Sequence, residues 1–154
     1  MAVNTRIRVE LNGVDKKLAR MALKVENLET PLRQSATYME GSISKRFRNQ
    51  GGSQGKWAPL SAATLKRHPH RVGGKILSDT GDLKRSVTAG HNQRLTNKTL
   101  HYGAGSNLVY AGVHQFGWNN NGRGHIPARP YLYFDKADER IIKQIFTDYI
   151  EGLM

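Results

Sequence analysis

Apolar and charged residues alternate near the start of the chain. Ile7, Val9 and Leu11 are separated by charged residues, and this period of two is typical of a strand with one buried face. A tight turn is predicted at Asn12-Gly13, which follows directly. We therefore expect an N-terminal strand over residues 6–11.

Two apolar stripes with helical spacing follow the turn. The first runs from Val14 to Leu28 and the second from Leu32 to about Arg48, with apolar residues recurring every three or four positions. Thr30-Pro predicts the start of the second helix, because a hydroxyl can cap it and proline suits its first turn. We expect a bend near residues 27–31 to separate two helices, with one long kinked helix as the alternative.

A third and clearer helix is predicted after Asp135. This residue can cap the helix, and Asp138 and Glu139 place negative charge in the first turn, which favours the helix dipole. The main apolar stripe and the residues that widen it are Ala137, Ile141, Ile145, Tyr149 and Leu153, then Ile142, Phe146 and Ile150.

The centre of the chain is rich in glycine, polar side chains and positive charge. We predict mobile loops at about 49–56, 66–75 and 117–124, because these segments hold few residues that could pack. Between the first two loops, Ser61 is expected to cap a short helix over residues 62–66.

An acidic turn closes the second loop. Asp79 or Thr80 can satisfy backbone donors there, and Gly81 permits a positive φ. Asp82 is expected to cap a short helical turn that carries Leu83. Asp79, Gly81 and Asp82 are therefore predicted to be structural turn residues.

A small antiparallel sheet is predicted next. Strands are expected over Ser86–His91 and Thr99–Gly103, with residues 93–98 as the hairpin loop between them. Together with the helices, this order of elements predicts an α+β fold: an N-terminal strand and two helices, a small antiparallel sheet in a loop-rich centre, and a long C-terminal helix. A chain of 154 residues fits one domain over residues 1–154.

A short helix is predicted just after Ser106 and Asn107, either of which can cap it. Gly117 is expected to end this helix in a conformation with positive φ, and the prolines on both sides of Arg129 keep the following segment extended. The residues that mostly fit one face of the helix are Tyr110, Val113, His114 and Phe116.

Charge is distributed unevenly along the chain. The net charge is +12, and residues 41–134 carry all of this excess, with fourteen basic residues against only Asp79 and Asp82. Such a segment favours contact with DNA or with an acidic protein surface. The alternative is a solvated basic surface without a partner. The candidate basic surface consists of Lys56, Lys66, Arg67, Arg71 and Lys75.

Several classes of function find no support in the composition. The chain has no cysteine, which excludes disulfides and zinc sites built on thiolates. No apolar run is long enough to span a membrane, so we expect a soluble, intracellular protein that makes no membrane contact. With His68 and His70 in a flexible loop and two carboxylates in the centre, we expect no metal, cofactor, small-molecule substrate or enzymatic activity.

Aromatic and arginine side chains near the loops are candidates for an interface. Trp57 can anchor the end of its loop in the core or dock on a partner. Trp118 stands among glycine and asparagine, which favours an interface role. Arg129 can hold backbone carbonyls or the carboxylates of residues 79 and 82, or it can pair with an acidic partner. The candidate interface residues are Trp57, Phe116, Trp118, Arg123 and Arg129.

A series of short motifs in a fixed order runs from about Phe47 to Phe134. The motifs are Phe47, Trp57-Ala-Pro-Leu-Ser61 with Thr64, Ile76-Leu-Ser-Asp-Thr-Gly-Asp-Leu83, Tyr102-Gly-Ala-Gly-Ser106, Tyr110-Ala111, His114-Gln-Phe-Gly117 and Ile126-Pro-Ala-Arg-Pro-Tyr131. In this order they resemble the phage virion morphogenesis family, the tail-completion proteins of contractile-tailed phages and prophages that include the Mu G-like proteins.

The resemblance implies a structural protein of the virion without catalytic activity. It implies tail completion or head–tail joining at the head-proximal end of the tail, after assembly in the host cytoplasm. The expected partners are other tail or head–tail connector proteins and further copies of the chain as a homo-oligomer. The alternative, suggested by the charge, is a basic nucleic-acid-binding protein that contacts DNA in the head–tail channel.

Overall fold

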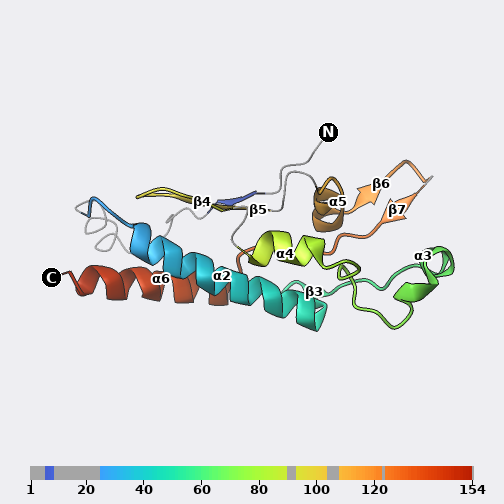
Figure 1. Ribbon diagram of the computed structural model, residues 1–154, viewed down its shortest axis with the longest axis horizontal. Helices are drawn as coiled ribbons and strands as arrows, with labels where there is room; N and C mark the ends of the chain where they lie inside the picture. Colours follow the sequence, from blue (N-terminus) through green and yellow to red (C-terminus); the bar gives the residue numbers. More distant parts are fainter. Residues whose placement is uncertain (1–5, 9–24, 90–92, 104–107, 123, 154) are drawn as a thin grey trace.

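Two long antiparallel helices form the frame of the molecule. The structure, a computed structural model, describes residues 6–8, 25–89, 93–103, 108–122 and 124–153. In Figure 1, α2 (Glu29–Asn49) and α6 (Lys136–Glu151) lie side by side, and the shorter elements follow one face of α2 and extend beyond one end of the pair. Mixed helices and small antiparallel sheets confirm the predicted α+β class.

Helices α2 and α6 together supply eight of the seventeen buried hydrophobic residues found in the described part of the chain. The predicted stripe of α2 is buried from Leu32 to Phe47. On α6 the buried face is centred on the residues predicted only to widen the stripe. Ile142, Phe146 and Ile150 are buried, whereas Ala137 and Leu153 of the predicted main stripe are exposed. Burial of one such side chain stabilises the fold by roughly 1.5–3 kcal/mol. The contact with α2 therefore decides which face of α6 turns inward.

Helix α2 begins before the predicted cap. Its first residue is Glu29, whose N–H donates to Asn27 Oδ1 at 2.8 Å, and Thr30 caps nothing. The reason is the burial of Leu28, whose N–H donates to Asn97 O at 2.7 Å and fixes the chain at this point. Residues 25–28 are not helical, and the rest of the predicted helix over Val14–Leu28 lies outside the described residues.

A buried ion pair ties the two long helices together. Arg46 of α2 and Asp138 of α6 are both almost fully buried, and Arg46 Nη2 lies 2.5 Å from Asp138 Oδ2. Arg46 Nη1 also donates to the carbonyl oxygens of Tyr131 and Tyr133. The same arginine therefore holds the segment that leads into α6.

The start of α6 forms a capping box around the same carboxylate. Asp135 accepts from the N–H groups of Ala137 and Asp138, and Asp138 Oδ2 accepts from the N–H of Asp135. Ser42 and Tyr38 of α2 donate their hydroxyl hydrogens to Asp138 Oδ1 at 2.7 and 3.1 Å. The predicted cap at Asp135 is confirmed, and Asp138 links this cap to α2.

A three-stranded antiparallel sheet has the order β1–β5–β4, with β1 at Arg6–Arg8, β5 at Leu100–Gly103 and β4 at Gln93–Leu95. The strand predicted over Thr99–Gly103 is confirmed within one residue. The loop predicted over 93–98 is wrong at its first three residues, which form β4. A turn over Thr96–Thr99 joins the strands, with Thr96 N–H donating to Thr99 O.

The strand predicted over Ser86–His91 is wrong. Residues Asp82–Thr88 form helix α4 instead, and Leu83 and Val87 are its buried residues. These two side chains stand four positions apart and pack together toward α2, so burial on one helical face outweighs the β preference of Val87 and Thr88. Residues 90–92 lie outside the described part of the chain.

The three segments predicted to be mobile loops contain short elements. Gly51–Gly52 (β2) pairs with Gly55–Lys56 (β3), and Trp118–Asn119 (β6) pairs with His125–Ile126 (β7). Between them lie α3 (Ala62–Arg67), capped by Ser61 as predicted, and the 3-10 turn η1 (Pro69–Arg71). Their mobility stays a prediction.

Candidate interface at the loop-rich end

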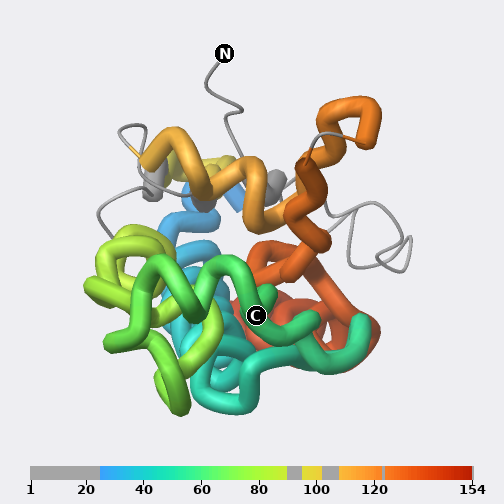
Figure 2. Tube along the Cα trace, turned by 90° about the vertical axis from the view of Figure 1, so that its right-hand side faces the viewer, coloured from blue at the N-terminus to red at the C-terminus, as the bar shows by residue number. Residues whose placement is uncertain are grey.

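One end of the molecule consists almost entirely of loops and short elements. We call it the loop-rich end and define it as residues 57–81, 109–122 and 124–130. It extends beyond α2 and α6 in Figure 1, and Figure 2 looks onto it, with the β6–β7 hairpin standing apart from the rest. Most of the candidate residues from the sequence lie here.

Helix α5 (Ala111–Phe116) is the rigid element of this end. The buried side chain of Gln115 donates to Leu132 O at 2.7 Å and accepts from the N–H groups of Tyr131 and Leu132 at 3.0 Å each. Tyr131 in turn donates its hydroxyl hydrogen to Ala111 O at 2.9 Å. One polar side chain thus fixes α5 against the segment that enters α6.

The buried face of α5 differs from the predicted stripe. Ala111, Gly112 and Gln115 are buried, whereas Tyr110 and Phe116 are exposed. Sequence reasoning missed Gln115 because a glutamine in a short helix looks like a surface residue. The predicted caps at Ser106 and Asn107 lie outside the described residues. Gly117 ends α5 with φ 77°, as predicted.

Large apolar side chains are exposed at this end. Among the described residues, the exposed large hydrophobic side chains number six, and all but Leu153 belong to the loop-rich end: Val72, Val109, Tyr110, Phe116 and Trp118. We call these five residues the apolar patch. Where exposed apolar side chains adjoin one another, they are typical of a surface that a partner covers.

Trp118 and Trp57 have different environments. Trp118 is 45% exposed, and its ring lies so close to Gly124 that a Cβ there would come within 2.9 Å. Trp57 is buried, and its indole N–H donates to Pro130 O at 2.9 Å, with the ring edge-on to Phe47. Trp57 therefore anchors the start of the loop-rich end in the core, and its side chain offers no free surface to a partner.

Arg129 is a buried link between two segments of this end. Its guanidinium donates to the carbonyl oxygens of Ala58 and Pro59 at 2.8 and 2.9 Å, and its backbone N–H donates to His114 O. No carboxylate of the described residues forms an ion pair with it. Burial and the nearby charge of Arg71 lower the pKa of Arg129.

The acidic turn has the predicted glycine geometry but a different cap. Gly81 has φ 81° and precedes α4, whereas Asp82 is the first helical residue and caps nothing, so its predicted capping role is wrong. Thr80 Oγ1 accepts from the Asp82 N–H and donates to its carboxylate. Hydrogen bonds from Thr80 and Arg85 lower the pKa of Asp82.

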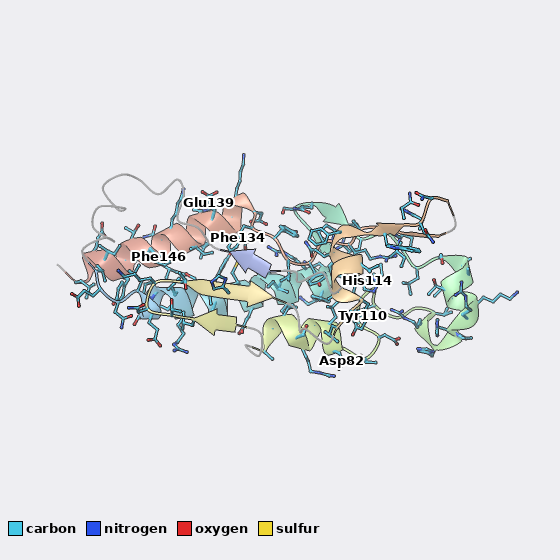
Figure 3. The ribbon with its side chains drawn as sticks, turned by 90° about the horizontal axis from the view of Figure 1, so that it is seen from above. Asp82, Tyr110, His114, Phe134, Glu139 and Phe146 are labelled. Carbon is cyan, nitrogen blue, oxygen red and sulfur yellow. The ribbon has the colours of Figure 1, made fainter. Side chains whose placement is uncertain are left out.

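A pocket of about 250 Å³ opens between this turn and α5. Figure 3 shows Asp82, Tyr110 and His114 on the same side of the molecule, away from the α6 residues Glu139 and Phe146. The Tyr110 ring lies edge-on to His114, with 5.9 Å between centroids. The lining residues are Arg71, Leu77, Asp79, Thr80, Gly81, Asp82, Leu83, Tyr110 and His114.

His114 lies in the wall of this pocket, and its surroundings lower the pKa of its imidazole. Burial is the largest cause of this lowered pKa, and the positive charges of Arg129 and Arg71 are the smaller causes. Its Nδ1 is buried without a hydrogen-bond partner in the described part of the chain. A buried polar atom without a partner is costly, by roughly 1–3 kcal/mol, and this atom is closed off from solvent.

The basic side chains predicted for this region lie at the surface. Lys56, Lys66, Arg67 and Lys75 are exposed, and Arg71 is partly buried beside the pocket. Arg123 lies outside the described residues. Within the described ranges, no group of three or more metal-ligating side chains is found, and no helix there is long and apolar enough to cross a membrane.

Known proteins resemble this chain over nearly its whole length. The model of the phage virion morphogenesis family matches residues 9–151. The chain belongs to this family. The match extends on both sides of the motifs between Phe47 and Phe134 and includes α2 and α6. As a virion morphogenesis protein, the chain has a structural role in the assembly of a phage particle.

Three relatives of this virion morphogenesis protein show how far the likeness extends. The Mu-like prophage FluMu G protein 2 of Haemophilus influenzae is 30% identical over 96% of this chain and 99% of its own length. A protein of Escherichia phage Mu, named as a candidate capsid assembly protein G, is 27% identical over 92% and 91%. An uncharacterized protein of Methanocaldococcus jannaschii is 32% identical over 58% and 70%. No solved structure matches the chain significantly.

Proposed function

We propose that this protein acts in tail completion or head–tail joining, through protein–protein contacts made by the loop-rich end. The observation that carries the proposal is the apolar patch, whose five exposed side chains all belong to the loop-rich end. A patch of this kind has no role in the core of the subunit, and a neighbouring virion protein would cover it.

The support beneath the patch suits a docking role. Tyr110 precedes α5 and Phe116 is its last residue, and the position of this helix is fixed by three hydrogen bonds of Gln115 and one of Tyr131. A surface that is already ordered loses little conformational entropy when a partner binds. Aromatic side chains in such a setting commonly supply most of the binding energy of an interface.

The location and partners follow from the same proposal. The chain would act at the head-proximal end of the tail, as a homo-oligomer in contact with tail or connector proteins. We propose no catalytic step, because Asp79 and Asp82, the only acids of residues 41–134, already bond to side chains of their own segment. The relatives named as a G protein and a capsid assembly protein support a role in particle assembly.

Deletion of the gene in its phage or induced prophage tests this function. Electron microscopy should show separate heads and tails, or unstable tails, and a plasmid copy of the wild-type gene should restore joined particles. Normal infectious particles from the deletion would contradict the proposal. If the deletion instead gave particles with joined tails that fail to deliver their DNA, the protein would act after assembly, and the proposal would be wrong.

A second candidate is contact with DNA in the head–tail channel, favoured by the exposed Lys66, Arg67 and Lys75. Affinity for a duplex oligonucleotide should then fall steeply with salt, by a slope of about −0.9 per neutralised phosphate on logarithmic axes. Gel-shift or anisotropy titrations measure this slope. Absence of binding at low ionic strength would exclude this candidate.

A further inference from the structure

We propose that copies of this chain bind one another through opposite charges, with a basic arm of one copy against the acidic end of helix α6 in another. The arm is defined as residues 58–76, and the acidic end is the last turn of α6, which holds Asp148 and Glu151. The inference rests on the proposed function, because it names the surfaces that would build the homo-oligomer. Figure 1 shows α3 of the arm and the end of α6 at opposite ends of the molecule.

The arm is held at both ends and is otherwise open to solvent. Arg129 donates to the carbonyl oxygens of Ala58 and Pro59, and the N–H of Ile76 donates to Gln50 Oε1 at 2.8 Å. The structure describes every residue of the arm, and none of them is buried. A segment that is fixed at both ends but has no place in the core is suited to contact another chain.

The positive charge of the arm is not matched within the described residues. The arm has four arginine or lysine side chains and no acidic one. Arg71 is partly buried and faces Asp79, with 3.8 Å between Nε and Oδ2. Lys66, Arg67 and Lys75 are exposed and form no ion pair in the described part of the chain. These three cations can therefore pair with carboxylates of a neighbour.

Helix α6 has the opposite charge at its end. The basic residues of this helix are Lys136, Arg140 and Lys143. All three precede its last turn, whose only charges are those of Asp148 and Glu151. The last turns of α2, α3 and α4 each hold an arginine or lysine, which the helix dipole favours. The end of α6 instead adds negative charge where the dipole is already negative, and a cation from a neighbour would relieve this repulsion.

The two carboxylates can be approached together. Asp148 and Glu151 are exposed and three positions apart, so they share one face of α6. Asp148 accepts from Gln144 Nε2 at 2.6 Å, and neither carboxylate forms an ion pair within the described residues. Leu153 follows the helix and carries no charge, so the contact does not depend on it.

A second copy of the chain accounts for both charged surfaces. Two copies that lie antiparallel would make the contact twice, and copies that follow one another would form a ring or a filament. Opposite charges also orient the encounter of two proteins and exclude wrong partners. A nucleic acid could pair with the arm, but the carboxylates of α6 would repel it and would stay without a partner.

Sedimentation velocity on the full chain tests the contact. The wild-type chain should form dimers or larger assemblies as its concentration rises, and added salt should dissociate them, because exposed charges are screened. The arm variant is Lys66→Glu with Arg67→Glu, and the end variant is Asp148→Lys with Glu151→Lys. Each should weaken self-association at least about tenfold, because like charges would then face each other.

A mixture of the two variants gives the sharpest result. The acidic arm of one variant meets the basic end of the other, and the two unaltered surfaces also match, so the mixture should assemble as the wild type does. Circular dichroism checks that each variant is folded. The matched control is Lys136→Glu with Arg140→Glu, which reverses two exposed charges of α6 before its last turn and should leave assembly intact.

Four results would each overturn the proposal: a wild-type chain that stays monomeric, full assembly of either variant alone, an equal loss from the control, or failure of the two folded variants to assemble together. Glutamine at the same positions replaces any variant that does not fold, and it should weaken association in the same way. If the wild-type chain stays monomeric while the arm variant loses affinity for duplex DNA, the arm contacts nucleic acid and the proposal is wrong.

Complementation separates this inference from the function on which it rests. If the deletion strain makes normal particles, the proposed function fails, whatever the chain does in solution. If the deletion blocks assembly but the arm variant alone restores it as well as the wild-type gene does, the function stands and the contact between copies fails. Restoration by the two variants expressed together, but by neither alone, would support both.

Discussion

The helical frame, formed by α2 and α6, and the loop-rich end differ in how completely their polar groups are paired and their apolar groups are buried. In the frame, the charge of Asp138 is buried against Arg46 and receives hydrogen bonds on both oxygens. At the loop-rich end, Phe116 is 64% exposed and His114 Nδ1 has no partner among the described residues. The difference indicates that polar groups are fully paired in the helical frame, whereas the other end leaves one buried nitrogen unpaired and exposes an aromatic ring that a neighbour could cover.

The strongest way to break this contrast is Asp138→Asn. The change leaves the Arg46 guanidinium buried without its counter-charge, and loss of one partner of a buried ion pair costs about 3–5 kcal/mol. Urea unfolding followed by circular dichroism measures the loss in free energy of unfolding. Asp148→Asn is the matched control, because Asp148 is exposed on the same helix and bonds only to Gln144 among the described side chains. The control should change stability by less than about 0.5 kcal/mol, and equal losses would contradict the assignment.

Gly117→Ala should have the next largest effect. Gly117 has φ 77° and ψ 175°, and a Cβ there would meet Ala128 N and Ile126 O at 2.9 Å each. The strained backbone alone costs about 1–3 kcal/mol, and the close approach adds to it, so we expect about 3 kcal/mol in the same unfolding experiment. Gly122→Ala at φ 85°, with open space around it, should cost only about 1–2 kcal/mol. A larger loss of stability from Gly122→Ala than from Gly117→Ala would show that the segment holding Ile126 and Ala128 can move away from the new Cβ.

Phe116→Ser should separate assembly from stability. The side chain is exposed, so unfolding free energy should change by less than about 0.5 kcal/mol. Loss of an interface anchor commonly costs about 2 kcal/mol or more in binding, so the titre of infectious particles in complementation should fall at least about tenfold. Leu153→Ser is the control, since Leu153 is 58% exposed at the opposite end of the molecule. A matching loss from the control would remove the distinction between the two ends.

His114 should make a smaller contribution, visible as acid sensitivity. Burial and the charges of Arg129 and Arg71 lower its folded-state pKa below the usual 6.5. The unfolded chain therefore binds a proton more readily, and stability falls as the pH drops through 6.5 toward the folded-state pKa. His114→Gln should flatten this part of the profile by at most about 1.4 kcal/mol per pH unit. The control is His125→Gln, which removes an imidazole from an exposed position. It should leave this part of the profile unchanged.

Local patterns were sufficient where neighbouring residues decide the outcome. The stripe from Leu32 to Phe47 predicts α2, the Asp135 and Ser61 caps are confirmed, and Gly81 and Gly117 adopt the expected positive φ. Each of these features depends on residues within one or two turns of each other. The ordered motifs likewise led to the correct family without any knowledge of the contacts.

Local patterns failed where a distant segment competes for the same residues. Val87 and Thr88 favour a strand, yet contact with α2 makes their segment helical. Gln115 reads as a surface residue, yet it bonds to residues 131 and 132. Arg46 and Asp138 are 92 positions apart, and no local period relates them.

Periodicity and the order of elements thus establish the class of fold and the long helices, and the ordered motifs reveal the resemblance to the family. Folding in three dimensions selects the buried side of α6, joins Arg46 to Asp138, and turns the apolar side chains around α5 outward. The physical reason is range: capping, periodicity and backbone φ act between close neighbours, whereas burial depends on which distant segments meet.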